Sequence, residues 1–440
     1  MTEKIWHPCM QMRDTQEHPI ITIDRGQGIY LYDAQGKSYI DAISSWWVNL
    51  FGHANPRIVR ALTEQAHKLE QVIFSGFTHE PALRLSEALL ALLPGELSRI
   101  FFVDNGSSAV EAALKMCHGY FRNLGYPEKA KFAFLTHGYH GETMGALSVC
   151  GTALYRDAFA PMMVPQIEVA GPDCFRCPYG EARETCEAPC FAAMERAVTE
   201  NADVLAAIIV EPLVQCAGDF RMYPPVYLRK LRELASRAGV LLIFDEIAVG
   251  FGRTGTMFAL EQAGVSPDLI CLSKGITSGT LAMSLLALTE DIYQAFYGDY
   301  TEQKAFLHSH SYTGNALACA VAVETLNIFR DENVLAANVP KIAKLGQAVA
   351  ERFGDFKHTG EVRQRGFICA VELVADKGTK TPFDWKSRIG YQIYRKALER
   401  GALLRNLGEV IYFMPPYVIT EDEIETLADI AWAATRDVLG

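Results

Sequence analysis

Val240-Leu-Leu-Ile-Phe-Asp245-Glu246 and Asp268-Leu-Ile-Cys-Leu-Ser-Lys274 are two short apolar stretches, and each ends in a charged side chain. A short, nearly continuous apolar run is typical of a strand that is buried on both faces of a parallel sheet. In open α/β sheets, ligands bind outside the carboxyl ends of the strands. We therefore expect the carboxylate of Asp245 and the amine of Lys274 to face the same crevice.

A carboxylate and an amine in one crevice are two of the groups that pyridoxal phosphate (PLP) chemistry requires. The lysine forms a Schiff base with the cofactor, and the carboxylate holds the protonated ring nitrogen. A single acid or lysine at a strand end is usually just a solvated terminus, so the pair alone indicates this cofactor only weakly. The rest of the chain has to supply a phosphate site and a substrate pocket.

The surrounding sequence predicts an α/β fold. Between about residue 98 and residue 290, strand and helix signals alternate, and the short strands are apolar almost throughout. This pattern is typical of a mainly parallel sheet that is covered on both faces. Toward the C-terminus, helices expected at 339–353 and 389–400 mix with short strands expected at 367–373 and 410–414, which predicts a smaller α+β unit.

Two segments could hold a phosphate. Asp104-Asn-Gly106-Ser107-Ser108 follows a short strand expected at 100–103 and opens a helix near Ala109. A helix N-terminus presents free backbone N–H groups and a positive dipole end to an anion. Since serine is also a common helix cap, we weigh a phosphate site and an ordinary cap equally. The stretch 306–315, which opens the next long helix, is the second possible cradle.

Two loops carry further candidate ligands. Thr136-His-Gly-Tyr139-His-Gly-Glu-Thr143 follows a strand expected at 131–135, where cofactor-binding loops lie. Its two histidines lack a third ligand at metal-binding spacing, so we discount a metal there. Cys174-Phe-Arg-Cys177 and Cys186-Glu-Ala-Pro-Cys190 suit a tetrathiolate zinc or iron–sulfur site, and a loop of free or occasionally oxidised thiols fits equally well.

The composition limits the possible partners. The chain has 440 residues, half of them hydrophobic, so it can bury two or three structural units. A formal net charge of -11 at pH 7 without a basic block argues against nucleic acid and anionic membranes, and favours a small metabolite. The sequence lacks the start of a secretory signal and a bilayer-spanning stretch, and most cysteines lie singly in apolar segments, so we expect a cytoplasmic protein.

With these segments in hand, the chain resembles the class III PLP-dependent aminotransferases over nearly its full length. The resemblance implies a fold type I PLP-dependent transferase that works as a homodimer with shared active sites. It also implies a large PLP-binding domain at 66–324 and a small domain formed by the N-terminal segment 1–65 together with 325–440. The residues that carry it are Asp104-Asn-Gly-Ser-Ser-Ala-Val-Glu111, Gly138-Tyr-His-Gly141, Glu211-Pro212, Asp245-Glu246 with Gly250-Phe-Gly-Arg-Thr-Gly255, and Ser273-Lys274-Gly275.

The same resemblance implies roles for individual residues around the cofactor. Lys274 would hold PLP as a Schiff base and move a proton during the reaction. Asp245 would pair with the ring nitrogen, and Tyr139 would stack on the ring face. The phosphate would be held by Gly106 and Ser107, together with His310 and Ser311 from the second subunit.

Within the family, the chain resembles the biotin-pathway branch, which converts 8-amino-7-oxononanoate to 7,8-diaminononanoate. The amino donor in that branch is S-adenosylmethionine or lysine, and no residue of this sequence distinguishes the two. Arg405 would bind the substrate carboxylate because its planar fork matches both oxygens. The rest of the substrate pocket would be lined by Trp46, Tyr139, Ser309 and Cys9. The distinguishing residues are His7-Pro8, Ser44-Ser-Trp46-Trp47, Arg405 and Tyr412-Phe-Met-Pro-Pro-Tyr417.

Two positions depart from that branch and bear on the substrate pocket. Cys9 stands where an aromatic residue is common, and Asn406 stands where proline is common. The alternative activity is that of an ω-amino acid or diamine aminotransferase with pyruvate or another oxo acid as acceptor. A catalytically silent protein centred on the cysteine loop is less consistent with the presence of both Asp245 and Lys274.

Overall fold

The computed structural model describes residues 4–440, so residues 1–3 of the predicted N-terminal segment lie outside it. Its largest layer is a seven-stranded sheet in the order β4-β12-β11-β10-β7-β5-β6. The five strands from β11 to β6 are parallel, whereas β12 runs antiparallel to both of its neighbours. The strands are β4 (Leu97–Val103), β5 (Lys131–Leu135), β6 (Ile167–Val169), β7 (Leu205–Val210), β10 (Leu241–Asp245), β11 (Leu269–Leu272) and β12 (Ser284–Thr289).

Side chains of the central strands alternate between two apolar cores. In β7, Ile208 and Val210 pack in one core, whereas Ala207 and Ile209 pack in the other, and β10 and β11 alternate in the same way. Because both faces are covered, every side chain of these strands can be apolar. The predicted α/β fold with a mainly parallel sheet is therefore confirmed.

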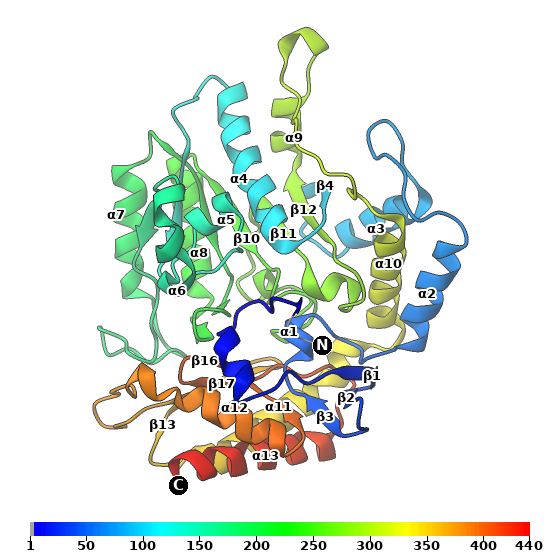
Figure 1. Cartoon of the computed structure of the whole chain (residues 1–440). Helices are drawn as coiled ribbons and strands as arrows, with labels where there is room; N and C mark the ends of the chain where they lie inside the picture. Colours follow the sequence, from blue (N-terminus) through cyan, green and yellow to red (C-terminus); the bar gives the residue numbers. More distant parts are fainter. Residues whose placement is uncertain (1–3) are drawn as a thin grey trace.

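Helices pack against both faces of this sheet (Figure 1). On one face α4 contacts β7, β11 and β12, and on the other α8 contacts β10. α4 begins earlier than the expected Ala109, at Gly106, because the Asn105 side chain caps it by accepting a hydrogen bond from Ser108 N at 3.0 Å. The helices of this part are α1 (Ser44–Trp47), α2 (Pro56–Ala66), α3 (Glu80–Leu90), α4 (Gly106–Asn123), α5 (Met144–Ser148), α6 (Ala153–Arg156), α7 (Ala192–Glu200), α8 (Val226–Ala238), α9 (Glu290–Phe296) and α10 (Ala316–Asp331).

A smaller α+β part forms the base of the molecule in Figure 1. Its antiparallel sheet has the order β13-β14-β17-β16. Three helices belong to it, and they include the two that were expected near 339–353 and 389–400. The elements are α11 (Val334–Phe353), β13 (Thr359–Arg365), β14 (Ile368–Leu373), α12 (Ile389–Glu399), β16 (Arg405–Leu407), β17 (Val410–Phe413) and α13 (Glu421–Leu439).

The N-terminal strands join this base through a third sheet, in the order β1-β2-β3-β15. β1 (Ile23–Gln27), β2 (Tyr30–Asp33) and β3 (Ser38–Asp41) are antiparallel. A tight turn follows Asp33, whose Oδ1 accepts hydrogen bonds from two backbone N–H groups of the turn. β3 then pairs in parallel with β15 (Ala402–Leu403), with Ile40 opposite Ala402. The N-terminal strands and a strand of the C-terminal part therefore belong to one sheet.

Three smaller observations complete the fold. A short two-stranded unit, β8 (Val214–Gln215) with β9 (Arg221–Met222), lies between β7 and α8 in the sequence. Both expected domain boundaries fall inside helices, one at the end of α2 and the other within α10. Among residues 4–440, no helix is both long and apolar enough to cross a membrane.

Candidate active site

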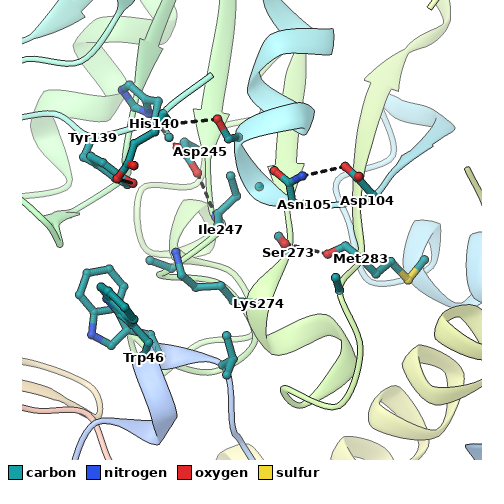
Figure 2. A pocket seen from close by; sticks show the side chains of 18 of the residues that line it. Trp46, Asp104, Asn105, Tyr139, His140, Asp245, Ile247, Ser273, Lys274 and Met283 are labelled. Carbon is teal, nitrogen blue, oxygen red and sulfur yellow. Dashed lines mark hydrogen bonds and ion pairs between the residues drawn. The ribbon is translucent and has the colours of Figure 1, made fainter. Parts of the chain in front are cut away.

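A cavity of about 570 Å³ lies at the carboxyl edge of the large sheet. Its walls come from the ends of β10 and β11, the N-terminus of α4, the loop after β5 and the N-terminal segment. Figure 2 shows Lys274 in this cavity with Trp46 on one side and Asp245 on the other. The predicted site residues that line it are Cys9, Trp46, Gly106, Ser107, Tyr139, Asp245 and Lys274.

Strand register explains why Asp245 and Lys274 meet. Asp245 at the end of β10 lies opposite Cys271 of the parallel strand β11, so Lys274 follows just beyond at the same sheet edge. The Lys274 Nζ lies 5.1 Å from the centre of the Trp47 ring. Burial lowers the pKa of Lys274, and the nearby Asp245 carboxylate opposes that shift only in part. A larger fraction of the amine is therefore neutral and nucleophilic near neutral pH.

The Asp245 carboxylate is held by two hydrogen bonds inside the protein. His140 Nδ1 donates to Asp245 Oδ2 at 2.7 Å, and Ile247 N donates to Oδ1 at 3.1 Å. Both side chains of the His140–Asp245 pair are almost completely buried. Because the acceptor is a carboxylate, Nδ1 of His140 carries the proton. These two donors fix the direction in which Asp245 faces the cavity.

Glu211, directly after β7, is a second buried carboxyl in the wall of the cavity. Its Oε1 accepts from Tyr139 N at 3.0 Å, and its Oε2 accepts from Cys216 N at 2.9 Å. Burial raises the pKa of Glu211 to about 7, because desolvation outweighs these two hydrogen bonds. Glu211 thus holds the backbone N–H of Tyr139, and with it the loop after β5, in place.

The N-terminus of α4 and the loop after β5 are joined through one hydroxyl. Ser107 Oγ accepts hydrogen bonds from Glu142 N at 3.0 Å and from Thr143 N at 2.9 Å. The two segments approach so closely at Gly141, whose φ is +117°, that a Cβ there would lie 2.3 Å from Ser107 Oγ. Glycine is therefore required at this contact.

Tyr139 projects into the cavity from this loop. Its hydroxyl donates to Glu142 Oε1 at 2.9 Å, and its ring packs against Tyr155 with the centroids 5.2 Å apart. Burial and the Glu142 carboxylate raise the pKa of Tyr139 well above its usual value, so the phenol stays protonated. The ring is held at both ends and presents a fixed flat face.

Arg405 lies in a second cavity, of about 780 Å³, between the N-terminal segment and α12. Its guanidinium lies over the Trp46 ring, 4.4 Å from the centroid, and Trp46 lines the first cavity. Among the residues that the structure describes, no carboxylate pairs with Arg405. The guanidinium is therefore available to an anion that reaches it past Trp46.

Ser309, His310 and Ser311 are not brought into the cavity of the same chain. They lie in the segment between η7 (Tyr300–Glu302) and α10, and none of them lines either cavity. His310 Nε2 is 4.0 Å from Asp104 Oδ1, at the outer end of the α4 turn. Within one chain, their expected contacts with cofactor and substrate are therefore not formed.

Three side chains of the site were not predicted from the sequence as site residues: His140, Glu211 and Glu142. His140 was weighed only as a metal ligand, although it stands within Gly138-Tyr-His-Gly141. Glu211 follows a buried strand in the same way as Asp245, and that repeated strand-end position was the available signal. Glu142 became visible only through its hydrogen bond to Tyr139.

The cysteine loop forms a separate structure. Cys174, Cys177, Cys186 and Cys190 all line one small cavity of about 200 Å³, and all are free thiols. Burial raises the pKa of Cys174 to about 12 and that of Cys190 to about 11, so these two thiols are protonated. Within residues 4–440, no group of three or more histidine, cysteine, aspartate or glutamate side chains is arranged to hold a metal ion.

Known proteins are similar to this chain in sequence and in fold over nearly its whole length. The family model "Aminotransferase class-III" matches residues 11–434. Adenosylmethionine-8-amino-7-oxononanoate aminotransferase of Geobacter sulfurreducens is 41% identical over 97% of this chain and 94% of its own length. The protein of the same name from Synechococcus elongatus is 42% identical, over 99% of this chain and 98% of its own.

Solved structures agree with these relatives. The adenosylmethionine-8-amino-7-oxononanoate aminotransferase of Methanocaldococcus jannaschii has a TM-score of 0.94 and 35% identity, and covers 100% of this chain and 98% of its own. An omega transaminase from Pseudomonas jessenii, solved in complex with PMP, has a TM-score of 0.94 and 30% identity, covering 99% and 96%. The chain therefore belongs to the class III aminotransferases, a family of pyridoxal phosphate-dependent transaminases.

Proposed function

We propose that this chain catalyses the PLP-dependent transamination of 8-amino-7-oxononanoate to 7,8-diaminononanoate, a step of biotin biosynthesis. Relatives that carry this substrate in their names are 41% and 42% identical over nearly the whole chain. The observation that carries the proposal is the meeting of Lys274 and Asp245 in one cavity, with the N-terminus of α4 in its wall.

The residues of the cavity fit PLP. A phosphate would lie at the N-terminus of α4, where the backbone N–H groups of Gly106 and Ser107 and the helix dipole favour an anion. Asp245, oriented by His140, would keep the proton on the ring nitrogen. When bound, PLP supplies an electron sink for the carbanion that forms at the amine-bearing carbon of the substrate.

Lys274 would bond the cofactor covalently and, once displaced by the donor amine, would carry a proton between substrate and cofactor. A lysine with a lowered pKa can accept and return a proton near neutral pH. Tyr139 would lie on the ring face, since Glu211 holds its backbone and Glu142 its hydroxyl. The protein would therefore supply Lys274 as a base, Asp245 as the partner of the ring nitrogen and Tyr139 as a stacking surface.

The far end of the substrate would reach Arg405. A carboxylate that binds the guanidinium bidentately would hold the aliphatic chain along Trp46, with Cys9 opposite. Ser309 of a second subunit would close the pocket. We propose a homodimer with shared active sites for this reason, because the segment with Ser309, His310 and Ser311 lies outside the cavity of its own chain.

Transfer between an ω-amino acid or diamine and pyruvate is the second candidate, because solved omega transaminases match this chain at a TM-score of 0.94 and 30% identity. The acceptor substrate distinguishes the two functions. Purified enzyme is offered 8-amino-7-oxononanoate or pyruvate, and the specificity constants kcat/KM are compared. Preference for 8-amino-7-oxononanoate is expected, and preference for pyruvate would establish the second function instead.

The proposal also covers the cell location and the division of the chain into domains. A cytoplasmic place agrees with a metabolic role, a net charge of -11 and free thiols at all eleven cysteines. We propose a large domain at 66–324 around the seven-stranded sheet, and a small domain that combines the N-terminal segment 1–65 with 325–440. The pairing of β3 with β15 supports placing the N-terminal strands in the small domain.

A further inference from the structure

Four consecutive residues at the active site have a left-handed backbone. The φ angles of Ser44, Ser45, Trp46 and Trp47, which form α1, are 51°, 46°, 78° and 72°. Residues with a Cβ atom disfavour this conformation and normally adopt it one at a time. Over residues 4–440, the other positive φ angles occur singly or in pairs. The left-handed turn 44–47 therefore depends on contacts that offset its conformational cost.

The left-handed turn carries two aromatic walls of the active site. The Trp46 ring lies against the Arg405 guanidinium, 4.4 Å from the centroid, and the Trp47 centroid lies 5.1 Å from Lys274 Nζ. Figure 2 shows the Trp46 ring beside Lys274. A change in the backbone of the turn would move one ring relative to the expected carboxylate ligand and the other relative to the reactive amine.

Asp41 holds the middle of the left-handed turn. Its side chain stands at the end of β3 and is completely buried. Asp41 Oδ1 accepts hydrogen bonds from Ser45 N at 2.9 Å and from Ile43 N at 3.3 Å, and Oδ2 accepts from Ser45 Oγ at 2.7 Å. Both donors of Ser45 are thus bound to one carboxylate. Because hydrogen bonds to a charged group are strong, Asp41 can stabilise the unfavourable backbone.

His53 fixes the direction of the Asp41 carboxylate. His53 Nε2 donates to Asp41 Oδ2 at 3.1 Å, and Nδ1 lies 3.2 Å from Asn49 Nδ2. The backbone of His53 is held by Gly28, because His53 N donates to Gly28 O at 2.7 Å and Gly28 N donates to His53 O at 3.2 Å. A Cβ at Gly26 would lie 2.6 Å from His53 Cβ, so the absence of a side chain there leaves room for the imidazole.

The two ends of the left-handed turn have separate supports. Ser44 Oγ donates to Met414 O at 2.7 Å, and the buried Arg253 guanidinium donates to Asn49 O, just after the turn, at 2.9 Å. Neither of these contacts reaches Ser45. The backbone conformation directly before Trp46 is therefore held by Asp41.

We propose that Asp41, oriented by His53, is a positioning residue for the acceptor substrate, because it holds the left-handed turn that sets the Trp46 and Trp47 rings. The inference rests on the proposed function, in which Arg405 binds the carboxylate of 8-amino-7-oxononanoate. Asp41 and His53 line neither large cavity, so both act through the two tryptophans.

The first test follows the two rings without any substrate. PLP-loaded protein is labelled with 5-fluorotryptophan, and the fluorine NMR resonances of Trp46 and Trp47 are assigned with the variants Trp46→Phe and Trp47→Phe. Asp41→Asn keeps the shape of the side chain but removes its charge and one hydrogen-bond acceptor, and it is expected to shift both resonances. Unchanged resonances overturn the inference.

Asp33→Asn is the matched control. Asp33 is a buried aspartate of the same sheet, and it also accepts hydrogen bonds from two backbone N–H groups and one hydroxyl, that of Tyr39 at 3.0 Å. It lines neither large cavity. Both variants are expected to lower the melting temperature, but the control leaves the resonances of Trp46 and Trp47 in place. Equal shifts in both variants would indicate general loosening of the sheet and overturn the inference.

The second test measures specificity for the substrate carboxylate. The specificity constant kcat/KM is compared for 8-amino-7-oxononanoate and for its methyl ester, which keeps the aliphatic chain but offers Arg405 no charge. The preference for the acid is expected to fall about tenfold in Asp41→Asn, mainly through KM, because Arg405 loses its support from Trp46. An equal loss for acid and ester would give Asp41 a structural role only and overturn the inference. If the wild type does not turn over this acceptor, the proposed function fails, and the fluorine resonances still test the positioning.

Variants of His53 reach the same turn without a change at Asp41, and they decide the question if Asp41→Asn does not fold. His53→Phe removes the donor to Asp41 Oδ2, whereas His53→Gln can still donate. We expect both resonances and the preference for the acid to change in His53→Phe and to return toward the wild-type values in His53→Gln. Wild-type behaviour of His53→Phe would overturn the inference.

Discussion

At the scale of single residues, the site depends on side chains that are held in unusual surroundings. Lys274 is an amine with a lowered pKa beside Trp47, and Asp245 is a carboxylate with two internal donors. Each departs from the solvated state that its residue type prefers. Such departures are typical of catalytic sites.

Lys274→Ala is expected to lower turnover by about 10²-fold or more, because the variant loses both the covalent attachment and the proton carrier. The visible absorbance of the bound cofactor is expected to change with it. Lys68→Ala, at an exposed position on the surface, serves as the control. A Lys274→Ala enzyme that still turns over at the wild-type rate would contradict the assigned role.

His140→Phe is expected to weaken PLP binding about tenfold, because a charged hydrogen bond to the buried Asp245 carboxylate is lost. The dissociation constant is measured by equilibrium dialysis of the cofactor-free protein. His140→Asn can still donate to the carboxylate and should recover part of the affinity, whereas His67→Phe at an exposed site is the neutral control. Equal affinities for all four proteins would show that His140 does not position Asp245.

Glu211 makes the stability of the protein depend on pH. Its pKa is about 7 in the folded chain against a usual 4.5, so the folded state binds the proton more tightly than the unfolded state does. This contribution to stability is complete below pH 4.5 and is lost as the pH rises toward and through 7. Glu211→Gln should therefore show a smaller fall of the melting temperature between pH 5 and pH 7.5. An unchanged pH profile would mean that Glu211 is ionised in the folded protein.

Sequence reasoning predicted the two charged strand ends because polarity at the end of an apolar run is a local signal. It did not predict the place of His140, since the bond to Asp245 joins residues that are 105 positions apart. The sequence also did not predict that Arg405 lies in a second cavity. Cavities are formed by packing between distant segments, and no local pattern encodes them.

At the scale of elements, α4 and the loop after β5 contact each other at the part of the cavity wall where we expect the phosphate. Gly141→Ala would place a methyl group 2.3 Å from Ser107 Oγ, so the loop and the helix N-terminus would have to separate. We expect weaker PLP binding and a smaller increase of the melting temperature on adding PLP.

Gly180→Ala is the matched control for this variant. Gly180 also has a positive φ, of +70°, but a Cβ there would meet no atom within 4 Å. The control therefore measures the backbone strain of alanine at positive φ without a clash. If both variants respond to PLP in the same way, the contact between Gly141 and Ser107 has no part in holding the cofactor.

Most elements were predicted from local patterns, and the exceptions have a physical reason. β5 was predicted with the right bounds because four consecutive apolar residues, 132–135, are flanked by the polar residues Lys131 and Thr136. The antiparallel direction of β12 was not predicted, since its apolar run at 285–288 resembles the apolar runs of the strands that are parallel to one another. Direction depends on the path of the connection between strands, and the apolar pattern carries no information about it.

At the scale of the whole molecule, Arg363 of β13 links the large and small parts. The side chain is almost completely buried, donates to Phe220 O at 2.9 Å, and pairs with Glu361 at 2.9 Å and Glu372 at 2.6 Å. Phe220 in turn packs against Trp47 in the wall of the active site, 5.6 Å between centroids. The buried Arg363 guanidinium thereby connects the small α+β part to the cavity wall through Phe220 and Trp47.

Arg363→Met is expected to destabilise the fold by about 3 kcal/mol, because buried carbonyls and carboxylates lose their donor. Urea unfolding of the PLP-loaded protein measures the loss. Arg330→Met provides the control, since the Arg330 side chain is 72% exposed and its ion pair with Asp331 lies on the surface. Equal stability of the two variants would exclude a structural role for the Arg363 network.

The pairing of β3 with β15 has a consequence for how the chain folds during synthesis. β3 can pair with β15 only after Ala402, the partner of Ile40, has been synthesised, which is 362 residues later. At ribosomal rates of 5 to 20 residues per second, the N-terminal hairpin stays unpaired on that edge for roughly 20 to 70 s. During this time β3 presents an open strand edge to other nascent chains, so early folding of the large α/β layer alone cannot protect the protein from misassembly.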